Sequence, residues 1–420
     1  MMIRYNDEFY TTKLDNGLTV QLFRKKGFNK SYFLFGTPIG SFDTNQLLDG
    51  KTKVSYPLGI AHFLEHKMFE KANVDVMDEF AKMGAQVNAF TSYEETCYYF
   101  STNKEYKKAL NLLLDFVQEL SLTKESVEKE KGIIVQELNM YKQISDMNLS
   151  LETFKSLYKE HPIKDDIGGD EKNVLDTTLE QLCKCYDLNY HPSRMILIGV
   201  IGSDIEEVLQ VIKDNQDKKE FKEFHSIKRE ILEEQKEVVR KNYEFSMDIN
   251  IPKVTYAIKL EPILEPVERE KMQLALEFLI KFIFTPMNDD YQKWINEEII
   301  NDSFDYDVGL SEENALVMFE NETNKIEEFY DLIQRQISDF DVSSFTAETL
   351  EQLKRRSYGS TLRMLDDFGN VAVRAMRSYF AGLDFYQSID LINEITLDDI
   401  KKAYKLLCND NVSKVKLLPK

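Results

Sequence analysis

Two histidines and a glutamate within one short apolar segment restrict the possible folds more than any other feature of the chain. Residues 59–69 read Gly-Ile-Ala-His-Phe-Leu-Glu-His-Lys-Met-Phe, so His62, Glu65 and His66 form a His-x-x-Glu-His pattern. On a helix, side chains four positions apart project from one face, and two imidazoles placed there can bind one zinc ion. A catalytic zinc takes a third protein ligand, which the fold must bring from a separate segment.

The alternative for this segment is a solvated polar face on an ordinary helix. Apolar side chains occupy most of the other positions: Ile60, Ala61, Phe63, Leu64, Met68 and Phe69. A histidine pair in such surroundings needs a partner, because burying polar groups without one costs free energy. A metal ion supplies that partner, so we expect one Zn²⁺ per chain. Glu65, three positions after His62, can poise a metal-bound water without being a ligand itself.

A second helical segment, residues 124–141, offers the missing ligand. Four of its side chains recur at intervals of four, three and four and so share one face: Glu130, Ile134, Glu137 and Tyr141. A metal ion and its imidazole ligands would remove the cost of burying two carboxylates there. This interpretation makes Glu137 the third ligand and Glu130 the acceptor that orients a histidine. The spacing by itself slightly favours the alternative, a solvated glutamate face on a surface helix.

The composition narrows the function classes. The chain has 420 residues, enough for two or more domains, and 43% of them are hydrophobic, enough for real cores. Its net charge of −20 repels nucleic acid and anionic membranes, so neither is expected as a partner. Four cysteines without a Cys-x-x-Cys pair are too few for a disulfide framework, and residues 1–7 lack the apolar core of a secretion signal. These features predict a cytoplasmic protein.

The order of predicted elements indicates two similar halves. In the first half, a strand at 31–37 precedes the predicted zinc-binding helix, and a buried strand at 195–202 closes the half. In the second half, a strand at 253–260 and a long apolar helix at 271–284 come first, and helices follow. We expect an α+β fold of two similar domains related by internal duplication, each a mostly antiparallel sheet covered by helices.

A charged stretch sets the predicted domain boundaries. Residues 213–237 carry dense Lys, Glu and Asp and are typical of a linker. The zinc-binding catalytic domain would then span 1–215, and a homologous domain would span 238–420. No histidine follows His225, so the second domain cannot repeat the metal site.

The chain resembles the pitrilysin, insulysin and mitochondrial processing peptidase family of inverzincin zinc peptidases. The resemblance covers nearly the whole first half, and the second half more weakly. It rests on residues 14–18, 62–66, 88–92, 130–137, 161–162, 168–169 and 190–192. The segment 61–71 most resembles a bacterial, cytoplasmic two-domain branch whose members work as two-chain assemblies.

This resemblance implies the catalytic residues of a zinc metalloendopeptidase. Zinc held by His62, His66 and Glu137 would polarise the scissile carbonyl and acidify a water molecule. Glu65 would take the proton of that water and pass it to the leaving amine, with Glu130 completing the catalytic set. The expected substrates are extended peptides or small precursor peptides, hydrolysed inside a clamshell chamber.

The resemblance also implies where the substrate binds. Residues 87–101 are rich in β-branched and aromatic side chains, and four of them match the substrate edge strand of the family: Asn88, Ala89, Phe90 and Thr91. An extended peptide would add to this strand through backbone hydrogen bonds. An ordinary sheet strand is the alternative that the composition leaves open.

A partner chain is expected because one part of the family pattern is missing. Members that act alone carry an arginine and a tyrosine, seven positions apart, that grip the substrate. The matching residues 291–306 contain no arginine, although Tyr306 stands near the tyrosine position. We therefore expect a heterodimer with a zinc-less homologue that supplies this pair, with a homodimer as the second choice. The alternative within this chain is Arg355 or Arg356 together with Tyr358.

Two other function classes stay open. The chain could be a non-catalytic structural subunit that keeps the fold within a larger assembly, or a zinc-dependent protein that holds peptide without cutting it. Glu65 argues against the structural subunit, because a scaffold needs no general base.

Overall fold

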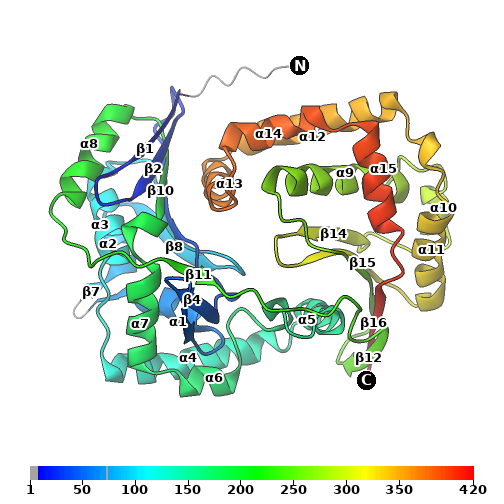
Figure 1. Cartoon of the computed structure of the whole chain (residues 1–420), viewed down its shortest axis with the longest axis horizontal. Coiled ribbons are helices and arrows are strands. Elements are labelled where there is room, and N and C mark those ends of the chain that lie inside the picture. Colours follow the sequence, from blue (N-terminus) through cyan, green and yellow to red (C-terminus); the bar gives the residue numbers. More distant parts are fainter. Residues whose placement is uncertain (1–7, 72–73) are drawn as a thin grey trace. The chain divides into compact units, whose positions relative to one another are not determined.

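The computed structural model describes residues 8–71 and 74–420, and the statements below concern those residues. Residues 1–7, on which the expectation about a secretion signal falls, lie outside them. The chain forms two compact units, each assembled from three stretches (Figure 1). Unit 1 comprises Met1–Asn139, Asp165–Glu230 and Met364–Phe380, and unit 2 comprises Met140–Lys164, Ile231–Arg363 and Ala381–Lys420.

A six-stranded sheet forms the centre of unit 1, with the strand order β1-β2-β10-β3-β9-β8. Its strands are β1 (Glu8–Lys13), β2 (Thr19–Arg24), β3 (Ser31–Thr37), β8 (Ala85–Thr91), β9 (Thr96–Thr102) and β10 (Ile196–Ile201). Neighbouring strands are antiparallel except for β2 and β10, which are parallel. The central strands β3 and β10 are buried along their whole length, whereas β8 lies at an edge of the sheet.

Helices cover both faces of this sheet. On one face, the core packs against α1 (Ile60–Met68), α2 (Val76–Lys82), α3 (Lys107–Val117), α4 (Lys124–Tyr141), α7 (Leu179–Asn189) and α8 (Ile205–Gln216). On the other face, α13 (Phe368–Phe380) packs against β3 and β10. A hydrogen bond of 2.8 Å between the hydroxyls of Thr19 and Tyr379 joins α13 to the sheet.

Unit 2 is built around a five-stranded sheet with the order β12-β16-β13-β15-β14. Its strands are β12 (Asn242–Met247), β13 (Lys253–Lys259), β14 (Asp305–Leu310), β15 (Ala315–Glu322) and β16 (Val412–Pro419). An apolar core joins one face to α9 (Pro266–Phe284), α11 (Ile326–Ser338), α12 (Ala347–Asp366), α14 (Phe385–Glu394) and α15 (Leu397–Leu407). Helix α5 (Ser145–Leu157) covers the other face, where the hydroxyls of Thr153 and Thr255 lie 2.7 Å apart.

The two sheets share one topology, which confirms the predicted α+β fold of two similar halves. Numbered along the chain, the strands of unit 2 stand in the order 1-5-2-4-3, and the last five strands of unit 1 stand in the same order. The first and fifth strands form the parallel pair in both sheets. The same connections made twice are the mark of an internal duplication.

The halves exchange one helix. Helix α5 follows α4 in the first half as α13 follows α12 in the second, yet α5 packs on the sheet of unit 2 and α13 on the sheet of unit 1. The compact units are therefore discontinuous, whereas the predicted domains 1–215 and 238–420 are single stretches. The chain passes from unit 1 to unit 2 after Glu230, within the predicted linker 213–237. That stretch also holds β11 (Ile227–Arg229), which pairs with β4 (Asn45–Leu48).

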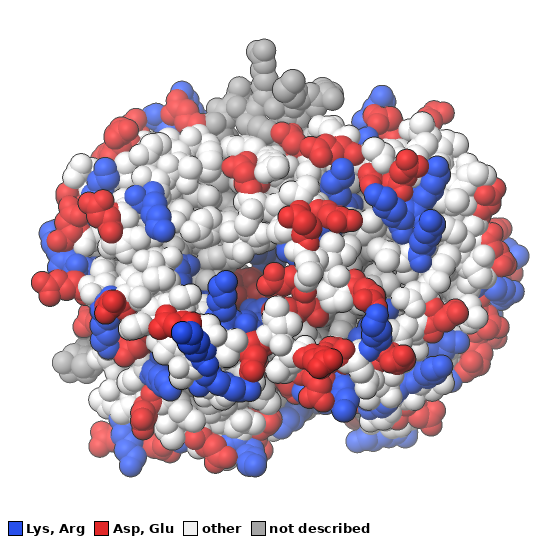
Figure 2. Space-filling view, in the orientation of Figure 1, with Lys and Arg blue, Asp and Glu red and all other residues white. Residues whose placement is uncertain are grey.

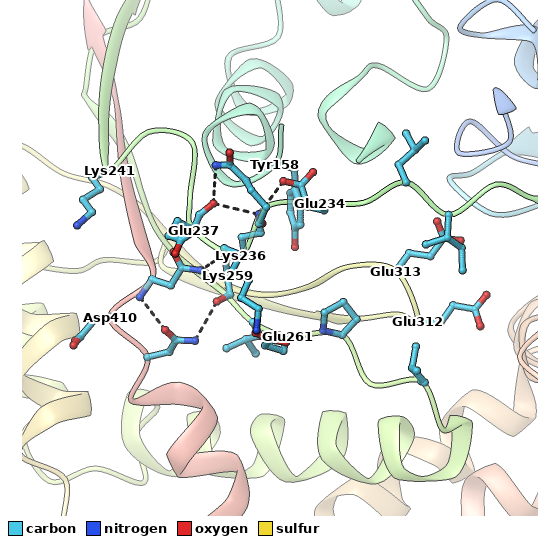
Figure 3. Close-up of a pocket in the computed structure, with 18 residues that line it drawn as sticks. Tyr158, Glu234, Lys236, Glu237, Lys241, Lys259, Glu261, Glu312, Glu313 and Asp410 are labelled. Carbon is cyan, nitrogen blue, oxygen red and sulfur yellow. Dashed lines mark hydrogen bonds and ion pairs between the residues drawn. The ribbon is translucent and has the colours of Figure 1, made fainter. Parts of the chain in front are cut away.

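A cavity of about 680 Å³ lies in unit 2 beside the segment that follows β11 (Figure 3). The buried Lys259 ammonium donates to the carbonyl oxygens of Leu157 and Gln235, both at 2.8 Å, and pairs with Glu234 at 3.2 Å. The Glu234 carboxylate in turn accepts hydrogen bonds from the backbone N–H groups of Lys159, Glu160 and His161. These bonds fasten the segment to α5 and to the sheet of unit 2.

Charged side chains of both signs are spread over one face of the molecule (Figure 2). On the face shown in Figure 2, acidic and basic side chains are interspersed, although acidic residues outnumber basic ones in the chain by 73 to 53. Within the described residues, no helix is both long enough and apolar enough to cross a membrane.

Candidate metal centre

Three glycines determine how α1 begins. Gly59, immediately before the helix, has a φ of 81° in the left-handed region, which an L side chain rarely adopts. A Cβ on Gly59 would lie 2.2 Å from the carbonyl oxygen of Gly168, and a Cβ on Gly169 would lie 2.5 Å from that of Leu58. The absence of side chains thus lets the loop at 168–169 lie against the start of the helix that carries the histidines.

Helix α4 begins at Lys124, where the Thr123 hydroxyl accepts a hydrogen bond of 3.1 Å from the N–H of Ser126. Its fully buried stripe consists of Val127, Lys131, Ile134 and Leu138. Glu130 and Glu137 lie at the border of this stripe, with side chains only 14% and 23% exposed. The alternative of a solvated glutamate face is therefore wrong, because both carboxylates are mostly shielded from water.

Three ligand atoms converge between α1 and α4. The Nε2 atoms of His62 and His66 lie 3.8 Å and 3.3 Å from Oε2 of Glu137. Tetrahedral zinc with ligand bonds of about 2.0–2.2 Å separates its ligand atoms by roughly 3.3–3.6 Å. Among residues 8–71 and 74–420, no other three His, Cys, Asp or Glu side chains converge in this way. The structure thus brings together the three residues that the sequence predicts as ligands.

The protonation of the histidines fits a cation between α1 and α4. Burial lowers the pKa of His62 to about 4, and the nearby His66 adds to the effect, so its imidazole is neutral at pH 7. Burial would lower the pKa of His66 as well, but its hydrogen bonds with Glu130 and Glu137 outweigh this and raise the pKa to about 10. The carboxylates beside His66 therefore favour positive charge there, and two imidazoles with a carboxylate form a donor set that zinc accepts.

Glu130 contacts the outer nitrogen of His66. Its Oε1 lies 3.1 Å from Nδ1 of His66, so the ring can donate a proton there and keep Nε2 directed toward Glu137. Burial would raise the pKa of Glu130, but His66 and the neighbouring Lys67 outweigh it and lower the pKa. Glu130 is accordingly a carboxylate at neutral pH, as an acceptor for the histidine must be.

Glu65 lies beside the predicted ligands and is held by a strand. Burial raises the pKa of Glu65, while a hydrogen bond of 2.9 Å from the Thr91 hydroxyl opposes that rise. Thr91 is the last residue of β8, and β8 pairs only with β9 among the described strands, so its other edge faces no strand. Glu65 and the edge strand are therefore coupled through the Thr91 side chain, a contact that sequence patterns do not reveal.

The four residues predicted for substrate binding all lie on this edge strand. Asn88 is exposed and its side chain accepts from the N–H of Ala89 at 2.9 Å. Phe90 packs against Tyr99 of the neighbouring strand, with ring centroids 6.4 Å apart. The predicted stretch 87–101 is two strands rather than one, because the chain turns between Thr91 and Thr96.

The residues predicted to grip the substrate, Tyr306 and Tyr358, have different surroundings in unit 2. Tyr306 is on β14, at an edge of the sheet of unit 2, where burial raises its pKa and Arg356 of α12 opposes the rise. Tyr358 packs against the apolar core of unit 2. Within unit 2, Arg356 therefore acts electrostatically on Tyr306, whereas the sequence prediction placed Arg356 with Tyr358.

Comparison with known proteins agrees with this architecture. Residues 54–170 match the model described as Insulinase (Peptidase family M16), and residues 176–357 match the Peptidase M16 inactive domain. A Bacillus subtilis protein named uncharacterized zinc protease YmfH is 34% identical over 417 residues, which cover 99% of this chain and 97% of YmfH. The chain belongs to peptidase family M16. The predicted family is thereby confirmed.

Two further M16 relatives differ in how much of the chain they match. The crystal structure of an M16-like peptidase from Alicyclobacillus acidocaldarius has a TM-score of 0.94 at 32% identity, covering 100% of both chains. The mitochondrial-processing peptidase subunit beta of Homo sapiens is 30% identical over 164 residues, which cover 37% of this chain and 33% of that protein. The full-length likeness is thus to bacterial M16 proteins, and these relatives include named zinc proteases.

Proposed function

We propose that this chain is the catalytic subunit of a zinc-dependent endopeptidase that holds one Zn²⁺ through His62, His66 and Glu137. The observation that carries the proposal is the convergence of three ligand atoms beside Glu65, a partly buried carboxylate with a raised pKa. A structural site fills all four zinc positions with protein ligands, whereas three ligands and a nearby carboxylate are typical of hydrolysis.

The chemistry follows from the positions of the side chains. Zinc, when bound, polarises a carbonyl and lowers the pKa of a coordinated water. Glu65 accepts the proton of the attacking water and returns it to the leaving amine, a role favoured by a pKa raised toward neutrality. Thr91 holds the Glu65 carboxylate in place, and Glu130 keeps the His66 ring oriented.

The substrate is an extended peptide that pairs with β8. An edge strand offers unpaired backbone groups, and a peptide that adds to it lies across the residue that holds the general base. Asn88, Ala89, Phe90 and Thr91 then present their backbone groups to the substrate, and their side chains alternate between the two faces of the sheet. Small precursor peptides and unfolded segments meet this requirement, because a folded protein has no free strand to offer.

We further propose a heterodimer with a zinc-less homologue, with a homodimer as the second choice, working in the cytoplasm. The absence of arginine from residues 291–306 supports a partner that contributes the substrate-gripping pair. The electrostatic effect of Arg356 on Tyr306 supports the opposing view that this chain supplies its own pair. All four cysteines are free, which is in keeping with a reducing compartment.

The test is hydrolysis of fluorogenic peptides by the chain alone and mixed with zinc-less homologues, with and without a chelator. The Glu65→Gln variant should keep its zinc and lose roughly 100- to 10,000-fold in kcat/KM, the usual contribution of a general base. Glu128→Gln is the matched control, because Glu128 lies on α4 with a side chain 57% exposed and pairs with Lys131. Stoichiometric zinc without cleavage in any mixture would instead establish the peptide-binding or structural alternative.

A further inference from the structure

Lys67 is a buried lysine beside Glu130, the carboxylate that contacts His66. It follows His66 on α1 and is 1% exposed, among the largest fully buried side chains of the chain. Its ammonium donates to the carbonyl oxygen of Ser126 at 3.2 Å and pairs with Glu70 and, at 3.3 Å, with Glu130. A buried ammonium is costly unless it is fully paired, so such a residue requires an explanation.

The two oxygens of Glu130 have different partners. Oε1 lies 3.1 Å from Nδ1 of His66, and Oε2 lies 3.3 Å from Nζ of Lys67. A carboxylate held through one oxygen can rotate about that contact, whereas contacts at both oxygens define its plane. The Glu130 side chain is 14% exposed, so water competes little for either contact. Lys67 therefore determines the direction from which Glu130 meets the His66 ring.

We infer that Lys67 is a positioning residue for the metal centre, acting through Glu130 on the imidazole of His66. The inference rests on the proposed zinc site but not on peptidase activity. By fixing Glu130, Lys67 keeps Nδ1 of His66 engaged and Nε2 directed toward Glu137, 3.3 Å away. The protein thereby loses less conformational entropy when the metal binds, because the ligand ring is already oriented.

Another buried lysine provides a matched comparison. Lys131 lies on α4, is 8% exposed, and pairs at 2.7 Å with Glu128 of the same helix. It is next to Glu130 in the chain, yet it forms its ion pair with Glu128, a mostly exposed carboxylate outside the predicted metal centre. A general cost of removing a buried lysine should appear in both positions, whereas an effect on the metal should appear only for Lys67.

The experiment measures zinc affinity by competition with a chromogenic chelator, and thermal unfolding of the zinc-free protein. Lys67→Met should weaken zinc binding roughly tenfold, the low end of the range for residues that support a ligand. Lys131→Met should leave the affinity unchanged even if it lowers the thermal midpoint. In the double variant Lys67→Met with Glu130→Gln, the loss should be smaller than the product of the two single losses, because both act through one contact.

Several results would overturn the inference. Unchanged zinc affinity in Lys67→Met, equal losses in both lysine variants, or fully multiplicative losses with Glu130→Gln would each show that Lys67 serves only the fold. If Lys67→Met does not fold, Lys67→Arg keeps the charge but displaces it, and should weaken affinity a few-fold; an unchanged value would be equally decisive. A parent chain that binds zinc without cutting peptide would refute the proposed function and leave this inference standing.

Discussion

Replacing Gly59 by alanine should destabilise the protein and loosen the metal centre together. The left-handed conformation at a φ of 81° costs an alanine about 1–2 kcal/mol. The new Cβ would also lie 2.2 Å from the backbone oxygen of Gly168, so the loop and the start of α1 must move apart by most of an ångström. Because neither atom is the end of a flexible side chain, we expect a total loss of about 2–4 kcal/mol.

The assay is urea unfolding followed by circular dichroism, with bound zinc measured on the same samples. The displaced loop lies beside His62, since a Cβ on Gly168 would come within 3.5 Å of its Nδ1, so zinc affinity should fall as well. Gly132→Ala is the control: Gly132 is an exposed residue within α4 with nothing within 4 Å of its Cβ position. That substitution should stabilise the protein by about 0.5–1 kcal/mol.

The two glycine substitutions should change the free energy of unfolding in opposite directions. If Gly59→Ala unfolds at the same urea concentration as the parent, the contact between the glycine loop and α1 does not constrain the helix. If Gly132→Ala lowers the free energy of unfolding as much as Gly59→Ala does, the loss comes from adding a methyl group to either helix and not from the left-handed conformation of Gly59.

Three other substitutions test the site. Thr91→Val removes the hydrogen bond to Glu65, so the pKa of Glu65 should rise further. The acidic limb of the pH profile of kcat/KM should then move to higher pH, and kcat should fall about tenfold. An acidic limb at the same pH as in the parent would show that Thr91 does not hold Glu65. Zinc at 100 times its Kd should stabilise the parent by about 2.7 kcal/mol in thermal unfolding, and Glu137→Ala should abolish this gain; retention of the gain would exclude Glu137 as a ligand. Arg356→Ala should raise KM in the lone chain if Arg356 and Tyr306 grip substrate, and an unchanged KM would favour a gripping pair supplied by a partner.

Local pattern predicted the helices that carry the metal site. The two histidines are four positions apart and the two glutamates seven, and these spacings place side chains on one face of a helix. Helices α1 and α4 form over those residues. The strand predicted at 31–37 is β3 with the same bounds, because a continuous apolar run bounded by turn residues suits a central strand. The long helix of the second half begins at Pro266 rather than at residue 271. Proline is favoured in the first turn of a helix, and the charged residues that follow it lack the apolar periodicity on which the prediction depended.

Sequence patterns could not predict the roles of residues whose contacts lie far away in the chain. Lys67 in the sequence is one basic residue after a histidine, and only the packing of α4 on α1 buries it against Glu130. The contact from Thr91 to Glu65 joins an edge strand to a helix 26 positions earlier. Neither contact follows from spacing, because spacing determines which side chains share a face and not what that face meets.

The residues alone predicted the α+β class from local periodicity and His62 and His66 as zinc ligands from a motif of fixed spacing, whereas Glu137 as the third ligand came with the family resemblance. The packing of distant segments sets the exchange of α5 and α13 between the halves, the place of β8 at a sheet edge, and the sharing of Glu130 by His66 and Lys67. The physical reason is that helix and strand periods are set within a few residues, whereas the partner of each buried face is chosen by the packing of the whole unit.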